Sequence, residues 1–284
     1  IVKITKKILI FLNDNSLDDE KTIEAARYCK NDLCSEIVYE FPELQGIMGG
    51  KYLKNEGFSE DICLAVAEHY LPAFYKDALP STKYGAIVSI ADKVETLISI
   101  FISGKRPSGS SDPYALRRNL NGVIKIIWDY EFDLPLENLF NELIDFWKIE
   151  FPNLNFSKEK VSNDLNEFIV QRIGSHLEEI SLGKELIKAV CSSNELSQKR
   201  ILNIVDLKNR IQSIVDFKEK ETFVEIQKII TRVSKLAKNS NLSTDVLSTR
   251  DNLNTKLFEK ECELKVFGFI KELEKLFSKG SCNY

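Results

Sequence analysis

Residues 81–104, which read STKYGAIVSIADKVETLISIFISG, set the fold class of this 284-residue chain. Apolar side chains recur through the stretch at the three- and four-residue intervals of a helix. Ser81 is a favoured residue for capping a helix start, and Gly104 is a favoured residue for stopping one. The spacing therefore predicts one long helix over 81–104.

Helical periodicity continues on both sides of this segment. Capping residues stand before the expected helices at Asp18 or Asp19, Ser59, and Ser111 or Asp112. Pro113 occupies the favoured first helical position of the last of these. Further amphipathic runs cover 136–149, 157–172, 182–192, 195–217, 219–238 and 254–278. No sustained period-two strand pattern appears, so the sequence predicts an all-α fold.

The net charge of −4 divides unevenly along the chain. Residues 1–150 carry 17 basic and 24 acidic side chains, a net of −7, whereas residues 151–284 carry 22 and 19, a net of +3. The segment EFPNLNFS at 150–157 interrupts the helical pattern where the sign changes. We therefore predict two domains, 1–150 and 151–284, and only the second has the charge suited to a polyanion.

Familiar catalytic motifs are missing from the sequence. The glycines of LQGIMGGKY at 44–52 lack the spacing of a phosphate-binding loop. No apolar run approaches the ~18 residues of a membrane-spanning helix. The six cysteines form no C-x-x-C pair, which favours reduced thiols in an intracellular protein. His176 lies among polar neighbours and is expected at the surface.

A histidine and two aspartates form the one candidate metal group. His69 ends the segment SEDICLAVAEH, Asp92 follows in the 81–104 helix, and Asp32 precedes both. Imidazole and carboxylate ligands suit Zn, Mn or Fe. The alternative interpretation is that these side chains fix helix ends by polar contacts, and the spacing leaves both interpretations open.

Basic side chains recur at helical spacing in the second predicted domain, where residues 195–240 hold ten basic and six acidic residues. The candidate polyanion contacts are Lys199, Arg200, Lys208, Arg210, Lys228, Arg232, Lys235, Lys238, and the earlier Arg117 and Arg118. Phe217 and Phe223 are candidate platforms for unpaired bases. A solvated helix face and burial of both rings are the competing interpretations.

Several ordered blocks of sequence carry a family resemblance: AARYCKNDLCSEIVYEFPELQGIMGGKY, EHYLP, STKYGAIVSIADKVETL and SSDPYALRRNLNGVIKII. Together they resemble the beta subunit of the bacterial two-subunit glycyl-tRNA synthetase (glycine–tRNA ligase). The likeness is strong over residues 18–130. It continues to QKIITRVSKLAKN, which resembles the basic helix of the family's DALR-type anticodon-binding region.

The resemblance implies a tRNA-recognition subunit of an α2β2 enzyme that attaches glycine to tRNA(Gly) in the cytoplasm. The alpha subunit would hold the adenylate-forming site and use ATP and Mg, so this chain would need no cofactor, membrane or catalytic residue of its own. IVKITKKILIFL begins as if in mid-helix, so we expect a fragment that is inactive alone. The expected parts are an HD-like helical domain at 1–150, truncated at its N-terminus, and an anticodon-binding domain at 151–284, truncated at its C-terminus.

HD-type phosphohydrolases resemble the first domain, and that likeness bears on the metal group. Their pattern would place Asn31 and Asp32 at the His-Asp pair, with His69 and Asp92 at later ligand positions. An amide at Asn31 replaces a metal-binding imidazole. We therefore expect a retained scaffold without a bound metal, with a metal-dependent phosphohydrolase as the alternative function.

The segment YEFPELQGIMG, residues 39–49, is expected to form a turn between helices inside that scaffold. Pro42 ends one helix, while Gly46, Gly49 and the following Gly50 permit positive φ or close backbone approach. Its apolar residues Leu44, Ile47 and Met48 are predicted to face the core.

Overall fold

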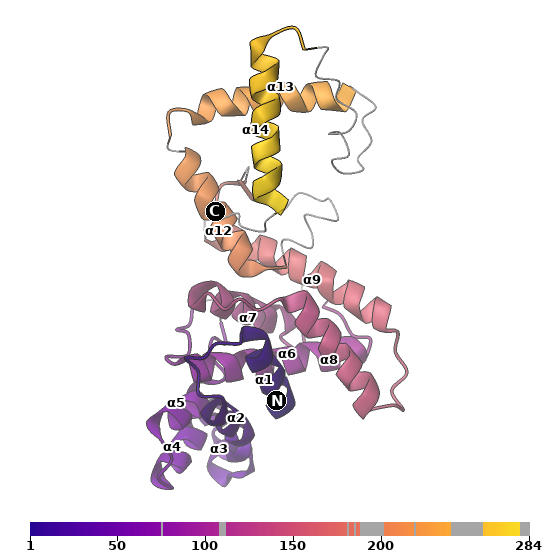
Figure 1. The fold of residues 1–284 in the computed structure, drawn as a ribbon. Helices are drawn as coiled ribbons and strands as arrows, with labels where there is room; N and C mark the ends of the chain where they lie inside the picture. Colours follow the sequence, from indigo (N-terminus) through magenta and orange to yellow (C-terminus); the bar gives the residue numbers. More distant parts are fainter. Residues whose placement is uncertain are drawn as a thin grey trace. The chain divides into compact units, whose positions relative to one another are not determined.

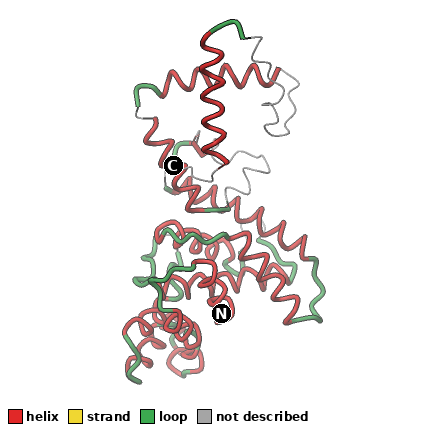
Figure 2. The backbone as a smooth tube through the Cα atoms, viewed as in Figure 1, coloured by secondary structure: helices red, strands yellow, loops and turns green. Residues whose placement is uncertain are grey.

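The structure is a computed structural model that describes residues 1–74, 76–107, 112–180, 182–184, 186–187, 202–218, 220–239 and 258–278. All regular elements in these ranges are helical, which confirms the predicted all-α fold (Figure 2). The chain divides into two compact units, Ile1–Ile211 and Gln212–Tyr284. Each unit is considered by itself.

Helices of the first unit pack around one long central helix (Figure 1). Their bounds are α1 Val2–Leu12, α2 Asp19–Tyr28, η1 Asn31–Cys34, α3 Glu36–Glu40, η2 Pro42–Leu44, α4 Ile47–Asn55, α5 Glu60–Glu68, α6 Lys83–Ile102, α7 Leu116–Tyr130, α8 Leu136–Glu150 and α9 Lys158–Glu179. The central helix is α6, which packs against α1, α2, α5, α7, α8 and α9. Its Ile90, Leu97 and Phe101 are fully buried. Each such side chain contributes about 1.5–3 kcal/mol when it is removed from water.

Predicted helix starts agree closely with the observed ones. Asp18 caps α2 by accepting a hydrogen bond from the backbone N–H of Lys21. Thr82, one residue after the predicted Ser81, caps α6 by accepting from the N–H of Gly85. Ser157 caps α9 by accepting from the N–H of Lys160.

Helix α7 begins three residues later than the sequence predicts. Ala115 takes the left-handed conformation at φ 55°, so Pro113 lies in a turn before the helix. Asp112 still serves the helix start, because its two carboxylate oxygens accept from the N–H groups of Leu116 and Arg117 at 2.8 Å each. Asp112, one of the two predicted capping residues, therefore binds the first turn, but the N-cap position is Ala115 and the predicted first helical position was wrong.

The second unit contributes α13, Phe223–Asn239, and α14, Glu261–Ser278, while α12, Ile204–Lys218, runs across the division between the units. The predicted domain boundary near 150 does not coincide with that division. Helix α9 lies beyond the boundary but packs against α6, α7 and α8, so it belongs to the first compact unit. The division into an HD-like domain at 1–150 and an anticodon-binding domain at 151–284 stays a prediction. Most of the predicted 182–192 helix lies outside the described residues.

Helix α4 lies against α5 through two glycines. A Cβ atom on Gly50 would lie 2.6 Å from the carbonyl oxygen of Cys63, and one on Gly49 would lie 2.9 Å from Val66 Cγ1. Gly46, just before the helix, has φ 78°. The predicted roles of these glycines are confirmed.

The same packing corrects the prediction that Ile47 faces the core. The glycines occupy the side of α4 that touches α5, so Ile47 lies exposed, while Leu44 and Met48 are half-buried.

Candidate functional site

Asp32, the first member of the candidate metal group, caps a helix. Its buried Oδ2 accepts hydrogen bonds from the N–H groups of Gly46 at 2.6 Å and Gly49 at 3.1 Å. Both donors belong to the N-terminal end of α4, where the helix dipole favours a negative charge. Asp32 therefore joins η1 to α4.

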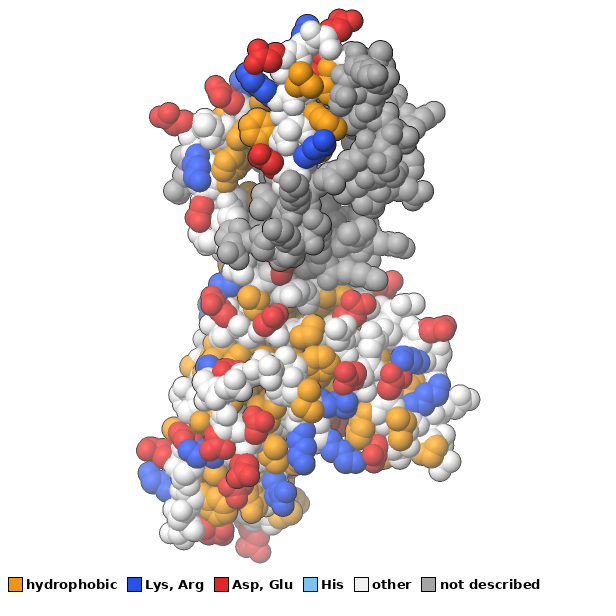
Figure 3. All heavy atoms as spheres, in the orientation of Figure 1, with side chains coloured by type: hydrophobic (Ala, Val, Ile, Leu, Met, Phe, Trp, Pro, Cys, Tyr) orange, Lys and Arg blue, Asp and Glu red, His pale blue; other side chains and the backbone are white. Residues whose placement is uncertain are grey.

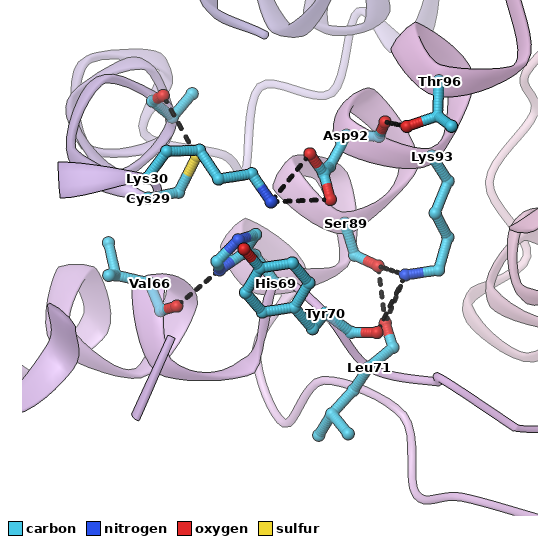
Figure 4. A network of polar contacts seen from close by, with 11 residues as sticks. Cys29, Lys30, Val66, His69, Tyr70, Leu71, Ser89, Asp92, Lys93 and Thr96 are labelled. Atoms are coloured by element: carbon cyan, nitrogen blue, oxygen red, sulfur yellow. Dashed lines mark hydrogen bonds and ion pairs between the residues drawn. The ribbon is translucent and has the colours of Figure 1, made fainter. Parts of the chain in front are cut away.

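His69, the second member, closes helix α5. Its side chain is fully buried, and Nδ1 lies 2.7 Å from the carbonyl oxygen of Val66 (Figure 4). Burial and, to a smaller extent, the nearby Lys30 ammonium together lower the pKa of His69 to about 4. The ring is neutral at pH 7 and packs against Tyr70, with the ring centroids 3.9 Å apart.

Asp92, the third member, is paired with a lysine. The ammonium of Lys30 lies 2.9 Å from Asp92 Oδ1 and 3.0 Å from Oδ2 (Figure 4). The same ammonium lies 3.7 Å from the centroid of the Tyr70 ring. An internal cation therefore neutralises this carboxylate, and the pair joins α6 to the end of α2.

Lys93, the neighbour of Asp92, holds the loop after α5. Its buried ammonium donates to the carbonyl oxygens of Tyr70 at 3.1 Å and Leu71 at 3.3 Å, and to Ser89 Oγ at 2.8 Å (Figure 4). Burial lowers the pKa of Lys93 to about 8. The sequence did not single out Lys30 or Lys93. Their roles depend on contacts between separate helices.

The residues of the group do not fit a bound metal. In the part of the chain that the structure describes, no three His, Cys, Asp or Glu side chains converge on a position that could hold one. Asp32 is engaged with two amides and Asp92 with Lys30. The geometry therefore supports the alternative interpretation, in which these side chains fix helix ends by polar contacts.

His176 corrects another prediction, because it is buried rather than at the surface. Its ring packs edge-on against Trp128, with the centroids 5.2 Å apart. Burial lowers its pKa to about 4. Polar neighbours in the sequence were misleading, since they occupy the other faces of α9.

Three of the candidate basic residues in the first unit contact carboxylates, a backbone carbonyl or an aromatic ring of the same unit. Lys208 lies 2.7 Å from the carboxylate of Glu131 and donates to the carbonyl oxygen of Trp128. Arg210 pairs with Asp206 at 2.8 Å. Arg118 is exposed and lies 5.3 Å from the Phe74 ring centroid, while Arg117 is half-buried in the first turn of α7.

The candidate basic residues of α13 form one face. Lys228, Arg232 and Lys235 are exposed and recur at intervals of four and three residues. At 3.6 residues per turn they fall within about 60° of arc. Ile226, Ile230 and Val233 lie on the opposite side. We name the three charged residues the α13 basic face.

The remaining candidates in this region are the two phenylalanines and three further basic residues. Phe217 and Phe223 are half-buried and pack edge-to-face on each other, with the centroids 5.7 Å apart. Lys199 and Arg200 lie outside the described residues, as does the side chain of Lys238.

Comparisons with known proteins place the chain among subunits of aminoacyl-tRNA synthetases. A family model described as glycyl-tRNA synthetase beta subunit matches residues 1–192. The glycine–tRNA ligase beta subunit of Trichodesmium erythraeum is 35% identical over 276 residues, which cover 96% of this chain and 38% of that protein. The corresponding subunit of Thermodesulfovibrio yellowstonii is 38% identical over 251 residues, 87% of this chain and 33% of the relative.

A third relative, the glycine–tRNA ligase beta subunit of Clostridioides difficile, is 32% identical over 275 residues, 96% of this chain and 37% of the relative. The chain belongs to the glycyl-tRNA synthetase beta subunit family. It spans between 33% and 38% of the length of these three relatives. Among the described helices, none has the length and apolar character needed to cross a membrane.

Proposed function

We propose that this chain is a tRNA-recognising part of a glycyl-tRNA synthetase. The α13 basic face carries the proposal, because three exposed cations on one side of a helix can contact successive phosphates of an RNA backbone. Family membership supplies the class of RNA, tRNA(Gly). Bases of the anticodon would be read as splayed, single-stranded nucleotides near this face, within the proposed anticodon-binding domain at 151–284.

The chemistry of aminoacylation is assigned to a partner. A separate alpha subunit would bind ATP and Mg and form the glycyl adenylate, and two copies of each subunit would assemble as α2β2 in the cytoplasm. This chain alone would then bind tRNA without charging it. The engagement of Asp32, His69 and Asp92 in structural contacts supports a recognition role.

Salt-dependent tRNA binding tests the proposal. We expect Arg232→Glu/Lys235→Glu to lower the affinity for tRNA(Gly) at least tenfold and to reduce the slope of log affinity against log salt by about 2. A matched control, Lys3→Glu/Lys6→Glu, makes the same charge change on exposed residues of α1. The proposal fails if both variants bind tRNA(Gly) alike or if the wild-type protein does not bind it.

A further inference from the structure

Segment 31–50 combines exposed apolar and acidic side chains. It contains four acidic residues and no lysine or arginine. Asp32 is buried, which leaves Glu36, Glu40 and Glu43 exposed. The apolar residues Leu33, Ile37, Phe41 and Ile47 are each 44–49% exposed, and Tyr39 is 86% exposed. We name these eight exposed residues the acidic–apolar surface.

The local backbone explains why these apolar groups face outward. Phe41 follows Ile37 by one helical turn, and its N–H donates to the Ile37 carbonyl oxygen, so both side chains lie on one side of α3. Ile47 is turned outward because Gly49 and Gly50 occupy the side of α4 that contacts α5. Grouped exposure of this kind is typical of interaction sites.

A pocket adjoins the same elements. Its volume is about 360 Å³, and the residues that line it include Tyr28, Asn31, Asp32, Tyr52, Asn55 and Glu56. Two carboxylates and two tyrosines line it, and no lysine or arginine does. Oδ1 of the buried Asp32 has no hydrogen-bond partner.

That lining suits an organic cation. A guanidinium or ammonium group pairs with carboxylates and is attracted to aromatic faces. A protein side chain, arginine or lysine, carries such a group on an apolar stem of suitable length. A metal ion is a poorer fit, because no three His, Cys, Asp or Glu side chains among the described residues converge as metal ligands would.

We propose that the acidic–apolar surface and the pocket bind a protein partner that presents apolar side chains beside an arginine or lysine. Charge complementarity favours protein over RNA here, because exposed carboxylates repel phosphate groups. The identity of this partner rests on the proposed function: it is the alpha subunit. The proposed tRNA contacts belong instead to the α13 basic face. Figure 3 shows hydrophobic and acidic side chains close together at the lower left, where Figure 1 places α3 and α4.

Binding of the purified alpha subunit to the 284-residue chain tests the inference. We expect Ile37→Lys to weaken this binding at least about tenfold, because it places a charge within a desolvated contact. Glu56→Lys is expected to weaken it by several-fold through the pocket. The matched control is Ile149→Lys, since Ile149 is 77% exposed on α8, outside the acidic–apolar surface. Its affinity for the alpha subunit should stay within about twofold of wild type.

The outcomes separate the two proposals. Unchanged binding of the alpha subunit by Ile37→Lys and Glu56→Lys, with wild-type melting temperatures, overturns the inference, as does a wild-type protein that does not bind the alpha subunit. Loss of tRNA(Gly) affinity in Ile37→Lys without loss of the alpha subunit would show an RNA surface and also overturn it. If the wild-type protein binds the alpha subunit in the expected way but not tRNA(Gly), the proposed function fails while the inference stands.

Discussion

The charged groups around Asp92 and those of the α13 basic face differ in what they contact. Lys30, Asp92 and Lys93 are mostly removed from water and bind other parts of the first unit. Lys228, Arg232 and Lys235 are exposed along one side of a helix. A residue type with catalytic potential therefore reveals little about function until its contacts are known. Changes in the first region should alter stability, and changes in the second should alter RNA binding.

The largest expected effect tests the packing that places Asp32 at α4. Gly50→Ala should lower the free energy of unfolding by about 2–3 kcal/mol, because its Cβ would lie 2.6 Å from a backbone oxygen of α5. Chemical denaturation measures the change. Gly174→Ala is the matched control, because nothing lies within 4 Å of its Cβ position in α9, and it should be neutral or stabilising. Equal destabilisation of both variants would contradict the packing account.

A smaller loss of stability is expected when the internal cation is removed. Lys30→Met should cost about 1–2 kcal/mol, because Asp92 is only 16% exposed and loses its cation. Lys3→Met, which breaks the exposed pair between Lys3 and Glu150, should cost less than about 0.5 kcal/mol. Denaturation of Lys30→Met, Asp92→Asn and the double variant in a double-mutant cycle measures the coupling. No coupling between Lys30 and Asp92 would mean that the pair contributes nothing to the fold.

The buried histidines predict a pH dependence of stability. The folded-state pKa of His176 is about 4 and its ordinary value is 6.5, so between these values the unfolded chain binds a proton that the folded chain does not. Stability therefore falls as pH drops from 6.5 towards 4, by less than about 1.4 kcal/mol per pH unit for each histidine. His176→Leu should show a shallower slope in this window. An unchanged slope would mean that the imidazole titrates normally in the folded protein.

Chelation is expected to have the smallest effect. Because Asp32 and Asp92 already have N–H or ammonium partners, treatment with EDTA should leave the melting temperature unchanged. Elemental analysis of the dialysed protein provides a second readout. A stoichiometric transition metal that is lost in His69→Ala would contradict the assignment of these side chains to structural contacts.

Much of the fold could be predicted because helical periodicity and capping residues act locally. The central helix was predicted at 81–104 and observed at Lys83–Ile102. The start of α7 was missed because Ala115 adopts a left-handed conformation that short-range propensity does not favour. Ile47 was misplaced because the contact of Gly49 and Gly50 with α5 was not visible in the local pattern.

The candidate site was harder to predict than the fold. Asp32, His69 and Asp92 were identified by residue type, but the partners that decide their roles come from other helices. Lys30 and Asp92 are 62 residues apart in the sequence. The α13 basic face was easier, since its spacing is local and an exposed face needs no distant partner.

Binding of tRNA(Gly) by one variant from each of the two regions tests the central claim most directly. Lys30→Met and Arg232→Glu/Lys235→Glu would be titrated with tRNA(Gly) over one salt series, at a temperature where both are folded. We expect wild-type affinity and salt slope for Lys30→Met. For the α13 variant we expect at least a tenfold loss of affinity and a slope smaller by about 2. Wild-type binding by the α13 variant, or a loss confined to Lys30→Met, would contradict the assignment of tRNA recognition to the α13 basic face.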